Sequence, residues 1–393
     1  MHLEEIRALE KRYVMQTYGR NEIALVSGEG ARLRDSEGKE YIDLTSGIGV
    51  NCLGYHHPAL SAAISDQAQK LMHCSNLFYS EPMAQVAEHL VKSTGLSRVF
   101  FANSGAEANE AMIKTARKYS SDRYGKDRYK IITLRQSFHG RTMTTLMATG
   151  QDKFHQYFYP LPEGFAYVEA GDLAQFKSCA DEHVCAVIME MIQGEGGVLP
   201  LDQAFVQEVS AYCKAHDILV CVDEVQTGIG RTGTLFCNEQ YGIEPDIVSM
   251  AKGLGGGVPI GAILCGEKCA DTLQPGQHGS TFGGNLLACR AAQTVLSVVD
   301  QPQFLASVKE KGEYIREQLL AMHSPAIREV RGMGLMLGIG VDPQKRSDYV
   351  RALQEKGVLV LTAGEDTIRL LPPLVITKED IDQALACMKE VLK

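Results

Sequence analysis

The sequence predicts an α/β protein: a mostly parallel central sheet with helices on both faces, plus a smaller α+β domain built from both chain ends. The middle of the chain alternates short apolar runs with helical patterns, and the two ends lack this alternation. Segments 106–120 and 204–216 have the spacing of helices. The apolar runs are expected to be strands, at 98–102, 130–134, 186–191, 218–222 and 246–250.

The two chain ends are expected to form the smaller domain. The first residues read as an amphipathic helix with Leu3, Ile6 and Leu9 near one face, and residues 21–47 carry short β-like pieces with Gly-rich turns. Helical patterns run from about 285 to 321 and precede a strand-like run at 331–341 and a βαβ-like tail at 345–390. We therefore expect a large domain at 49–290, with 1–48 and 291–393 as the two parts of the small domain.

Composition excludes several classes of protein. The 393 residues carry a net charge of −9 and no long run of Lys or Arg, which argues against nucleic-acid binding. The 11 cysteines are scattered without a CxxC pair, so neither a metal site nor a disulfide framework is expected. No apolar run reaches the roughly 18 residues of a membrane span. The charged N-terminus does not resemble a signal peptide, and we expect a cytoplasmic protein.

Five polar clusters are interpreted as following predicted strands, at 103–110, 137–141, 222–228, 250–257 and 278–285. In open α/β sheets, ligands bind outside the carboxyl ends of the strands. We therefore expect these five clusters to converge on one site.

The first two clusters suggest anion and ring binding. NSGAEANE opens a helix, and the small Gly105 and Ala106 allow backbone N–H groups to approach a phosphate at its positive end. The alternative is an ordinary helix cap. In SFHGR, Phe138 is suited to stack on a flat ring and Arg141 to bind a carboxylate. The alternative is a core phenylalanine and a surface arginine.

The remaining clusters supply charges. Asp223 ends an apolar strand, where a buried carboxylate needs a partner such as a protonated heterocyclic nitrogen or a structural cation. Lys252 lies between a strand and a Gly-rich turn, and a buried lysine is suited to form a Schiff base. Ser280 and Thr281 offer hydroxyl groups in a loop that alone says little. Together the clusters contain every part of a pyridoxal-phosphate (PLP) site.

The ordered motifs SGAEANE, SFHGR, DEVQTGIGRTG, AKGLGGGVPIGA and GSTFGGN resemble those of the class III aminotransferases of PLP fold-type I. The resemblance runs from YGRNEIALVSGEG to IRLLPPLVIT, nearly the whole chain, and it implies a role for each matching residue. Lys252 holds PLP and moves a proton, Asp223 keeps the ring nitrogen protonated, and Gln226 reaches the ring 3-oxygen. Phe138 stacks on the ring, and Gly105 and Ala106 bind the phosphate. Glu224 and Val225 adjoin the cofactor, and Thr281 contacts the PLP of the neighbouring subunit in a homodimer.

Within the class, the chain is most similar to the acetylornithine aminotransferases of bacterial arginine biosynthesis. This resemblance implies N-acetylornithine and 2-oxoglutarate as substrates, bound by Arg141, Ser280 and Arg369. Arg141 is expected to hold the carboxylate distant from the reacting carbon, and Arg369 the adjacent carboxylate of glutamate. Glu195 is expected to cover Arg369 when the amine donor, which has no adjacent carboxylate, is bound, because an unpaired buried cation is costly.

Several alternatives stay open within the class. Ornithine aminotransferases commonly carry Trp where this chain has His139, and the γ-aminobutyrate enzymes differ around TAGEDTIRLLPPLVIT. Succinylornithine and N-succinyl-diaminopimelate aminotransferases are harder to separate. A PLP aminomutase or racemase needs no second keto acid, and a non-enzymatic role is disfavoured because Lys252 and Asp223 are both present. Two positions depart from the usual motifs, Leu286 for proline in GGNLLA and Tyr55 for histidine in LGYHHP.

Overall fold

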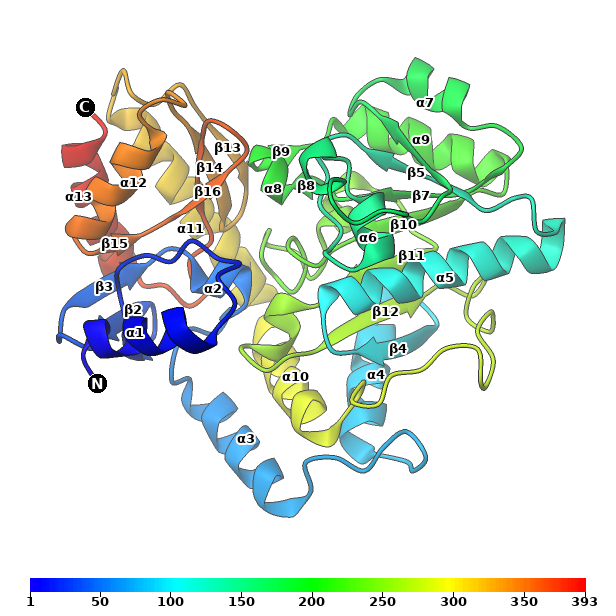
Figure 1. The fold of residues 1–393 in the computed structure, drawn as a ribbon, viewed down its shortest axis with the longest axis horizontal. Coiled ribbons are helices and arrows are strands. Elements are labelled where there is room, and N and C mark those ends of the chain that lie inside the picture. Colours follow the sequence, from blue (N-terminus) through cyan, green and yellow to red (C-terminus); the bar gives the residue numbers. More distant parts are fainter.

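The computed structural model describes residues 1–393 as two parts around a common core. The larger part contains a seven-stranded sheet in the order β4-β12-β11-β10-β7-β5-β6 (Figure 1). Six of these strands run parallel, and β12 is antiparallel to both of its neighbours. The strands are β4 (Arg98–Ala102), β5 (Lys130–Leu134), β6 (Phe165–Val168), β7 (Val184–Met189), β10 (Leu219–Asp223), β11 (Ile247–Met250) and β12 (Gly261–Cys265).

Helices cover both faces of this sheet. One face packs against α5 (Gly105–Tyr124), through residues such as Ile131, Leu219 and Ile247. Along each strand, every second side chain points to the opposite face of the sheet. On that face, Val187 and Val248 belong to the two larger groups of buried apolar residues. Its covering helices include α4 (Glu81–Thr94), α7 (Leu173–Cys179), α9 (Gln203–Ala215) and α10 (Leu286–Val299). Burial on both faces explains why the strands read as unbroken apolar runs.

The smaller part combines both chain ends. Strands β1 (Leu25–Glu29), β2 (Arg32–Asp35) and β3 (Glu40–Asp43) are joined by β15 (Val358–Leu359), which pairs in parallel with β3. A second sheet has the order β13-β14-β17-β16, with β13 (Glu329–Met333), β14 (Met336–Gly340), β16 (Leu361–Ala363) and β17 (Thr367–Leu370). The helices here are α2 (Ser46–Gly49), α12 (Arg346–Glu355) and α13 (Lys378–Val391).

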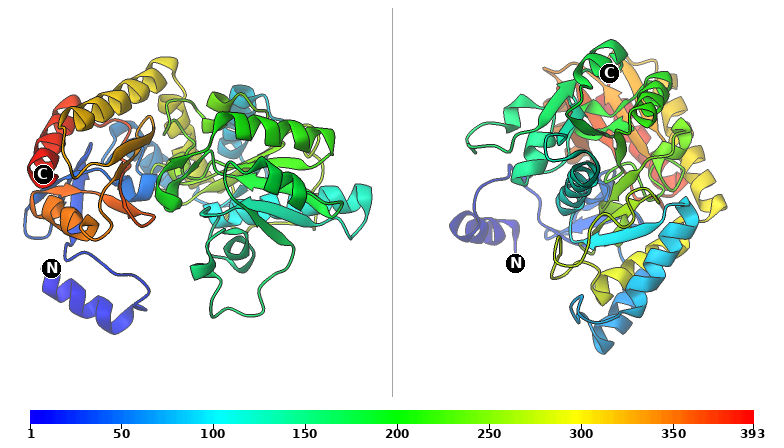
Figure 2. Two further views of the ribbon diagram at one scale, coloured as in Figure 1. Left: turned by 90° about the horizontal axis from the view of Figure 1, so that it is seen from above. Right: turned by 90° about the vertical axis from the view of Figure 1, so that its right-hand side faces the viewer.

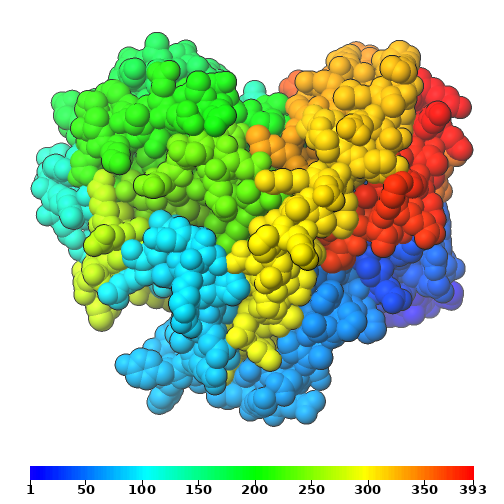
Figure 3. Space-filling view, turned by 180° about the vertical axis from the view of Figure 1, so that it is seen from behind, coloured from blue at the N-terminus to red at the C-terminus, as the bar shows by residue number.

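Helices α10 and α11 (Pro302–Ala321) connect the two parts across the back of the molecule, in yellow in Figure 3. Arg231 reinforces this connection from the large part. It is buried, and its Nη1 donates to the carbonyl oxygens of Leu335 at 2.9 Å and Pro372 at 2.5 Å. Burial lowers the pKa of Arg231 to about 10. Since these carbonyls flank β14 and β17, Arg231 fixes the position of the second small sheet.

The remaining helices lie at the edges. α1 (Leu3–Tyr13) has no buried residue and stands apart from the body in both views of Figure 2. α3 (Pro58–Lys70) packs on α10, and α6 (Met143–Ala148) lies near α5. The short hairpin β8 (Ile192–Gln193) and β9 (Leu199–Pro200) encloses α8 (Gly194–Gly197). None of the helices combines the length and the apolar character needed to cross a lipid bilayer.

The predicted fold class is confirmed, with two local differences. The run at 331–341 is a hairpin of β13 and β14, because Gly332 and Gly334 at positive φ allow a tight reversal. The C-terminal tail does not form a parallel βαβ unit, since β15 joins the first small sheet while β16 and β17 pair antiparallel in the second. Of the two unusual positions, Leu286 starts α10 after the Asn285 cap, and the Tyr55 hydroxyl donates to Asp43 at 2.7 Å.

Candidate active site

Four of the five predicted polar clusters lie at the carboxyl ends of parallel strands. They follow β4, β5, β10 and β11, which end at the same edge of the sheet. The fifth cluster, 278–285, does not follow a parallel strand. Strand β12 is antiparallel to β4 and β11 and ends at the opposite edge of the sheet, and the chain after it returns to the edge that carries the other four clusters. The return brings Ser280 back to the site, where its Oγ accepts a hydrogen bond from Asn103 Nδ2 at 3.0 Å.

The first cluster forms the N-terminus of α5. Ser104 caps the helix by accepting from the amide of Glu107 at 3.2 Å, so the expected cap is present. The amides of Gly105 and Ala106 make no hydrogen bond within the chain and remain available to an anion. A Cβ at Gly105 would lie 2.7 Å from Val225 Cγ1, so glycine permits the loop after β10 to pack against this helix end.

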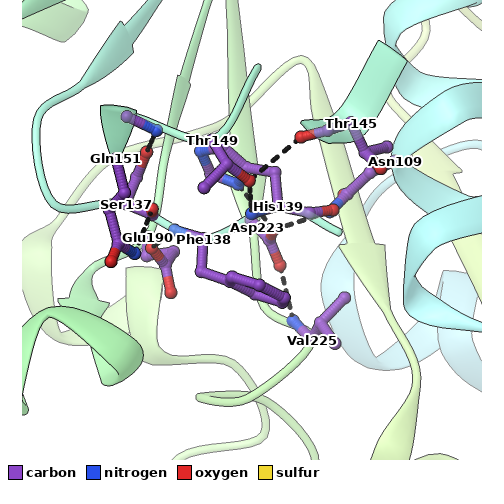
Figure 4. A network of polar contacts seen from close by, with 11 residues as sticks. Asn109, Ser137, Phe138, His139, Thr145, Thr149, Gln151, Glu190, Asp223 and Val225 are labelled. Carbon is purple, nitrogen blue, oxygen red and sulfur yellow. Dashed lines mark hydrogen bonds and ion pairs between the residues drawn. The ribbon is translucent and has the colours of Figure 1, made fainter. Parts of the chain in front are cut away.

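Asp223 lies at the centre of a polar network that Figure 4 shows from close by. Its side chain is buried, 3% exposed, at the end of β10. Oδ2 accepts from Asn109 Nδ2 at 2.7 Å and contacts His139 Nδ1 at 2.8 Å, while Oδ1 accepts from the amide of Val225 at 3.0 Å. No Lys or Arg forms an ion pair with it, so the alternative of a structural salt bridge to such a cation does not apply.

Lys252 lies two residues beyond β11, and its side chain makes neither a hydrogen bond nor an ion pair. Burial lowers the pKa of its ammonium group, and the nearby positive charge of Arg369 acts in the same direction. The carboxylates of Glu195, Asp223 and Glu190 oppose this shift. Its φ of +42° is rare for a residue with a Cβ, and such backbone strain tends to occur at functional sites. A partly buried lysine without a partner has a reactive amine.

The cluster after β5 places an aromatic ring beside a cation. Phe138 is half-buried, and Arg141 is exposed and forms no ion pair. The Arg141 guanidinium carbon lies 5.7 Å from the Phe138 ring centroid and 4.3 Å from that of Phe154. Phe154 also meets Phe138 edge-on, with ring centroids 6.0 Å apart. The predicted pair is therefore brought together, with Phe154 as a third member.

A second cation lies on β17. Arg369 is only 3% exposed, and its Nη1 donates to Glu195 Oε1 at 2.6 Å and to Gln226 Oε1 at 3.0 Å. Its Nε has no hydrogen-bond partner. Although burial alone would raise the pKa of Glu195, the adjacent Arg369 holds it below its usual value. A buried arginine with one carboxylate and one amide partner is prepared to bind a second carboxylate.

Two predicted residues lie apart from this group. The Glu224 carboxylate is engaged elsewhere, because it accepts from the amide of Asn238 at 2.8 Å and from the Thr227 hydroxyl. Burial raises the pKa of Glu224 to about 7. Thr281 is exposed, and its side chain forms no hydrogen bond with the other site residues. The Glu224 carboxylate is therefore hydrogen-bonded within the chain, and Thr281 lies on the surface.

Sequence reasoning missed three residues of the site, Asn109, Phe154 and Glu190, and it also missed the structural role of His139. Glu190 follows β7 directly, and its Oε2 accepts from the Phe138 amide at 2.9 Å. Burial raises the pKa of Glu190 to about 7. Its position after a strand is the same signal that identified Asp223. No local pattern marks Phe154, because only the folded chain brings it to Arg141.

The residues present fit pyridoxal phosphate. Free amides at the start of α5 suit a phosphate, a half-buried Phe138 suits a planar ring, and buried Asp223 suits a ring nitrogen. Lys252 supplies an amine without a partner at the same edge of the sheet. The site therefore contains a complement for each functional group of this cofactor.

Comparison with known proteins identifies the family. Residues 13–392 match the model of the family described as Aminotransferase class-III. The chain is 49% identical over its full length to an acetylornithine aminotransferase of Haemophilus ducreyi, covering 99% of that protein. It is 50% identical over 98% of both chains to an acetylornithine aminotransferase of Caldanaerobacter subterraneus subsp. tengcongensis.

Solved structures agree with this assignment. An ornithine aminotransferase from Toxoplasma gondii is similar with a TM-score of 0.96 and 32% identity, covering 100% of this chain and 95% of that one. The N-acetylornithine aminotransferase of Stenotrophomonas maltophilia is similar with a TM-score of 0.84 and 38% identity, covering 98% of this chain and 97% of that one. The chain therefore belongs to the class III aminotransferases and is a pyridoxal-phosphate-dependent transaminase.

Proposed function

We propose that this enzyme transfers the terminal amino group of N-acetylornithine to 2-oxoglutarate, giving N-acetylglutamate semialdehyde and glutamate. Relatives named acetylornithine aminotransferase that are 44–50% identical over 96–100% of their length support this substrate pair. The observation that carries the proposal is the pair of arginines, with Arg141 open and Arg369 covered by Glu195.

We further propose roles for the residues that hold the cofactor. When bound, pyridoxal phosphate supplies an aldehyde that combines with amines and a ring that withdraws electrons from the reacting carbon. The amides of Gly105 and Ala106 bind its phosphate, and Phe138 packs on its ring. Asp223 holds the ring nitrogen protonated through its negative charge. Val225 adjoins the ring, and Gln226 offers its amide nitrogen to the ring 3-oxygen, since its oxygen is engaged by Arg369.

Lys252 moves the proton of the reaction. Its lowered pKa favours the uncharged amine, so Nζ is able to accept a proton from the substrate carbon and then to donate it again. The negative charges of Glu195 and Asp223 near Nζ limit how far the pKa of Lys252 falls. The same nitrogen provides the covalent attachment point for the cofactor.

Substrate selection divides between the two arginines. Arg141 holds the carboxylate distant from the reacting carbon, which both N-acetylornithine and 2-oxoglutarate carry, and Ser280 lies nearby as a further polar group. Arg369 binds the adjacent carboxylate of glutamate or 2-oxoglutarate. When N-acetylornithine is bound, Glu195 keeps Arg369 paired, as in this structure. The Glu195–Arg369 pair thereby opens for one substrate and closes for the other.

We propose that the enzyme works as a homodimer with shared active sites. Segments 71–79 and 280–283 lie side by side, since Asn76 Nδ2 donates to the carbonyl oxygens of Ser280 and Gly283. This surface exposes large apolar side chains, including Leu77 at 85%, Phe78 at 67% and Phe282 at 59%. Thr281 lies within it, and we propose that it contacts the cofactor phosphate of the partner.

We propose that the chain has two domains. Residues 1–48 and 291–393 form the small domain, and residues 49–290 form the large one. The pairing of β3 with β15 supports this division, because it joins the two chain ends in one sheet. The enzyme acts in the cytoplasm, which the scattered free cysteines support, since such thiols persist in a reducing compartment.

A panel of amine donors tests the proposed substrate. N-acetylornithine, N-succinylornithine, ornithine, γ-aminobutyrate and N-succinyl-diaminopimelate are each offered with 2-oxoglutarate, and glutamate formation is measured. The highest kcat/KM is expected for N-acetylornithine. A preference for ornithine, whose aminotransferase shares this fold at a TM-score of 0.96, would replace the substrate and keep the reaction class. Product formed without 2-oxoglutarate would instead indicate an aminomutase.

A further inference from the structure

His139 and Asn109 hold the carboxylate of Asp223 from the side of the protein interior (Figure 4). Both contact Oδ2, at 2.8 Å for His139 Nδ1 and 2.7 Å for Asn109 Nδ2. All three side chains are buried. The Oδ1 atom of Asp223 accepts a hydrogen bond only from the amide of Val225. The two side-chain donors therefore converge on one oxygen and leave the other less engaged.

The backbone of His139 is itself fixed in place. The backbone amide of His139 donates to Thr149 Oγ1 at 2.9 Å, and its backbone carbonyl accepts from Asn109 Nδ2 at 2.7 Å. The Thr149 hydroxyl in turn donates to the carbonyl of Thr145 at 3.0 Å. His139 Nε2 is buried without any partner. The contact with Asp223 is therefore the only polar interaction of this ring.

The direction of that hydrogen bond follows from the chemistry of the pair. An ionised carboxylate only accepts, so the hydrogen of the imidazole lies on Nδ1. Burial alone would lower the pKa of His139, but the hydrogen bond to Asp223 and its negative charge raise it above the usual value. The same hydrogen bond restrains the Asp223 carboxylate, because Oδ2 is held between the donors of His139 and Asn109.

We propose that His139 is a positioning residue that acts through Asp223: its Nδ1–H fixes the carboxylate in the orientation in which it binds the cofactor's ring nitrogen. This inference rests on the proposed role of Asp223. A histidine that only fills the core would be replaceable by an apolar ring of similar size, whereas a positioning histidine needs a donor at Nδ1.

Three substitutions separate these two roles. His139→Phe keeps a ring of similar size and removes the donor. In His139→Asn the amide nitrogen stands near the place of Nδ1, and in His139→Gln it stands near the place of Nε2. Each full-length protein is titrated with pyridoxal phosphate to obtain its Kd. The holoenzyme is then prepared with a ¹⁵N-labelled cofactor, and the chemical shift of the ring nitrogen reports its protonation.

We expect His139→Phe to raise the Kd for pyridoxal phosphate by about tenfold or more and to shift the ring nitrogen toward its deprotonated position. His139→Asn should restore both values close to wild type, and His139→Gln should resemble His139→Phe. If His139→Phe does not fold, the comparison of Asn with Gln decides. Equal behaviour of Asn and Gln, or a Phe variant identical to wild type, would overturn the proposal.

A second histidine–aspartate pair provides the matched control. His89 Nε2 on α4 lies 2.8 Å from Asp300 Oδ2, outside the active site. His89→Phe should leave both the Kd and the ring-nitrogen shift unchanged, and a change of the size seen in His139→Phe would overturn the inference. A wild-type protein that binds no pyridoxal phosphate at all would instead contradict the proposed function.

Discussion

Arg369 Nη1 and Glu195 Oε1 lie 2.6 Å apart, joining β17 of the small part to the loop after β7 of the large part. Arg369 is almost fully buried, while the Glu195 side chain is about one third exposed, at 31%. Removing the partner of a buried cation is costly, so the pair favours whichever occupant keeps Arg369 neutralised. A carboxylate of the substrate and the carboxylate of Glu195 are alternatives for the same guanidinium.

Glu195→Gln is expected to separate the two half-reactions. Glutamine keeps an oxygen that accepts from Arg369 but removes the negative charge that pairs with it when the amine donor is bound. The rate with N-acetylornithine should fall by about tenfold relative to the rate with glutamate, which corresponds to about 1.4 kcal/mol. Stopped-flow measurement of each half-reaction gives the ratio. Glu88→Gln serves as the control, because Glu88 forms an exposed ion pair with Lys92. If Glu195→Gln gave the same ratio of half-reaction rates as the wild type, Glu195 would not alternate with a substrate carboxylate at Arg369.

Lys252→Ala is expected to lose nearly all turnover, since it removes both the attachment point of the cofactor and a proton carrier typically responsible for about 10²–10⁴-fold. The visible absorption of the attached cofactor should disappear with it. Lys268→Ala is the matched control, because Lys268 is paired with Asp217 at 2.5 Å away from the active site. Retention of the absorption band in Lys252→Ala would show that another amine holds the cofactor.

Phe154→Leu is expected to weaken the binding of carboxylated substrates. The centroid of the Phe154 ring lies 4.3 Å from the guanidinium carbon of Arg141 and 5.0 Å from the ammonium nitrogen of Lys153, and neither cation has a carboxylate partner. Loss of an exposed cation–π contact costs about 0.5–1 kcal/mol, so KM should rise about two- to fivefold with kcat nearly unchanged.

Steady-state kinetics with N-acetylornithine and with 2-oxoglutarate measure this effect, and both KM values should rise together. Phe154→Tyr keeps the ring and should match wild type. An amine donor without a carboxylate, such as 1,5-diaminopentane, should be unaffected by Phe154→Leu. An equal rise of its KM would mean that Phe154 shapes the site generally and does not act through Arg141.

Glu190 should make stability depend on pH in an unusual direction. Burial raises its pKa from 4.5 to about 7, so the folded state binds more protons than the unfolded state between these values. The wild type therefore loses stability as pH rises from 4.5 to 7, by about 3 kcal/mol through this group. Glu190→Gln removes this dependence and retains an acceptor for the Phe138 amide.

Thermal unfolding of wild type and Glu190→Gln at several pH values measures the difference. The variant should gain relative stability between pH 4.5 and 7 and show a constant difference above that range. Glu195→Gln should show the opposite sign, because the pKa of Glu195 is lowered and its stabilisation is lost as pH falls through that pKa. A pH-independent difference for Glu190→Gln would contradict the assigned protonation.

Much of the site was predictable from local patterns. Asp223 and Lys252 each follow an unbroken apolar strand, and six parallel strands necessarily end at one edge of a sheet. The same rule applies to Glu190, which lies one residue beyond β7. The rule failed for 278–285, because β12, the strand before this segment, is not among the predicted strands and runs antiparallel to its neighbours, so that it ends at the opposite edge of the sheet.

The sequence by itself determined the alternation of strands and helices, the strand ends that carry charged residues, and the order of motifs that marks the family. Only the tertiary structure decided the contacts between segments far apart in the chain. Arg369 and Glu195, 174 residues apart, meet because β17 is fixed beside the large part. His139 and Asp223, 84 residues apart, meet because β5 and β10 end at the same sheet edge. Local patterns encode burial and periodicity, whereas side-chain partners depend on how the packed core places whole elements.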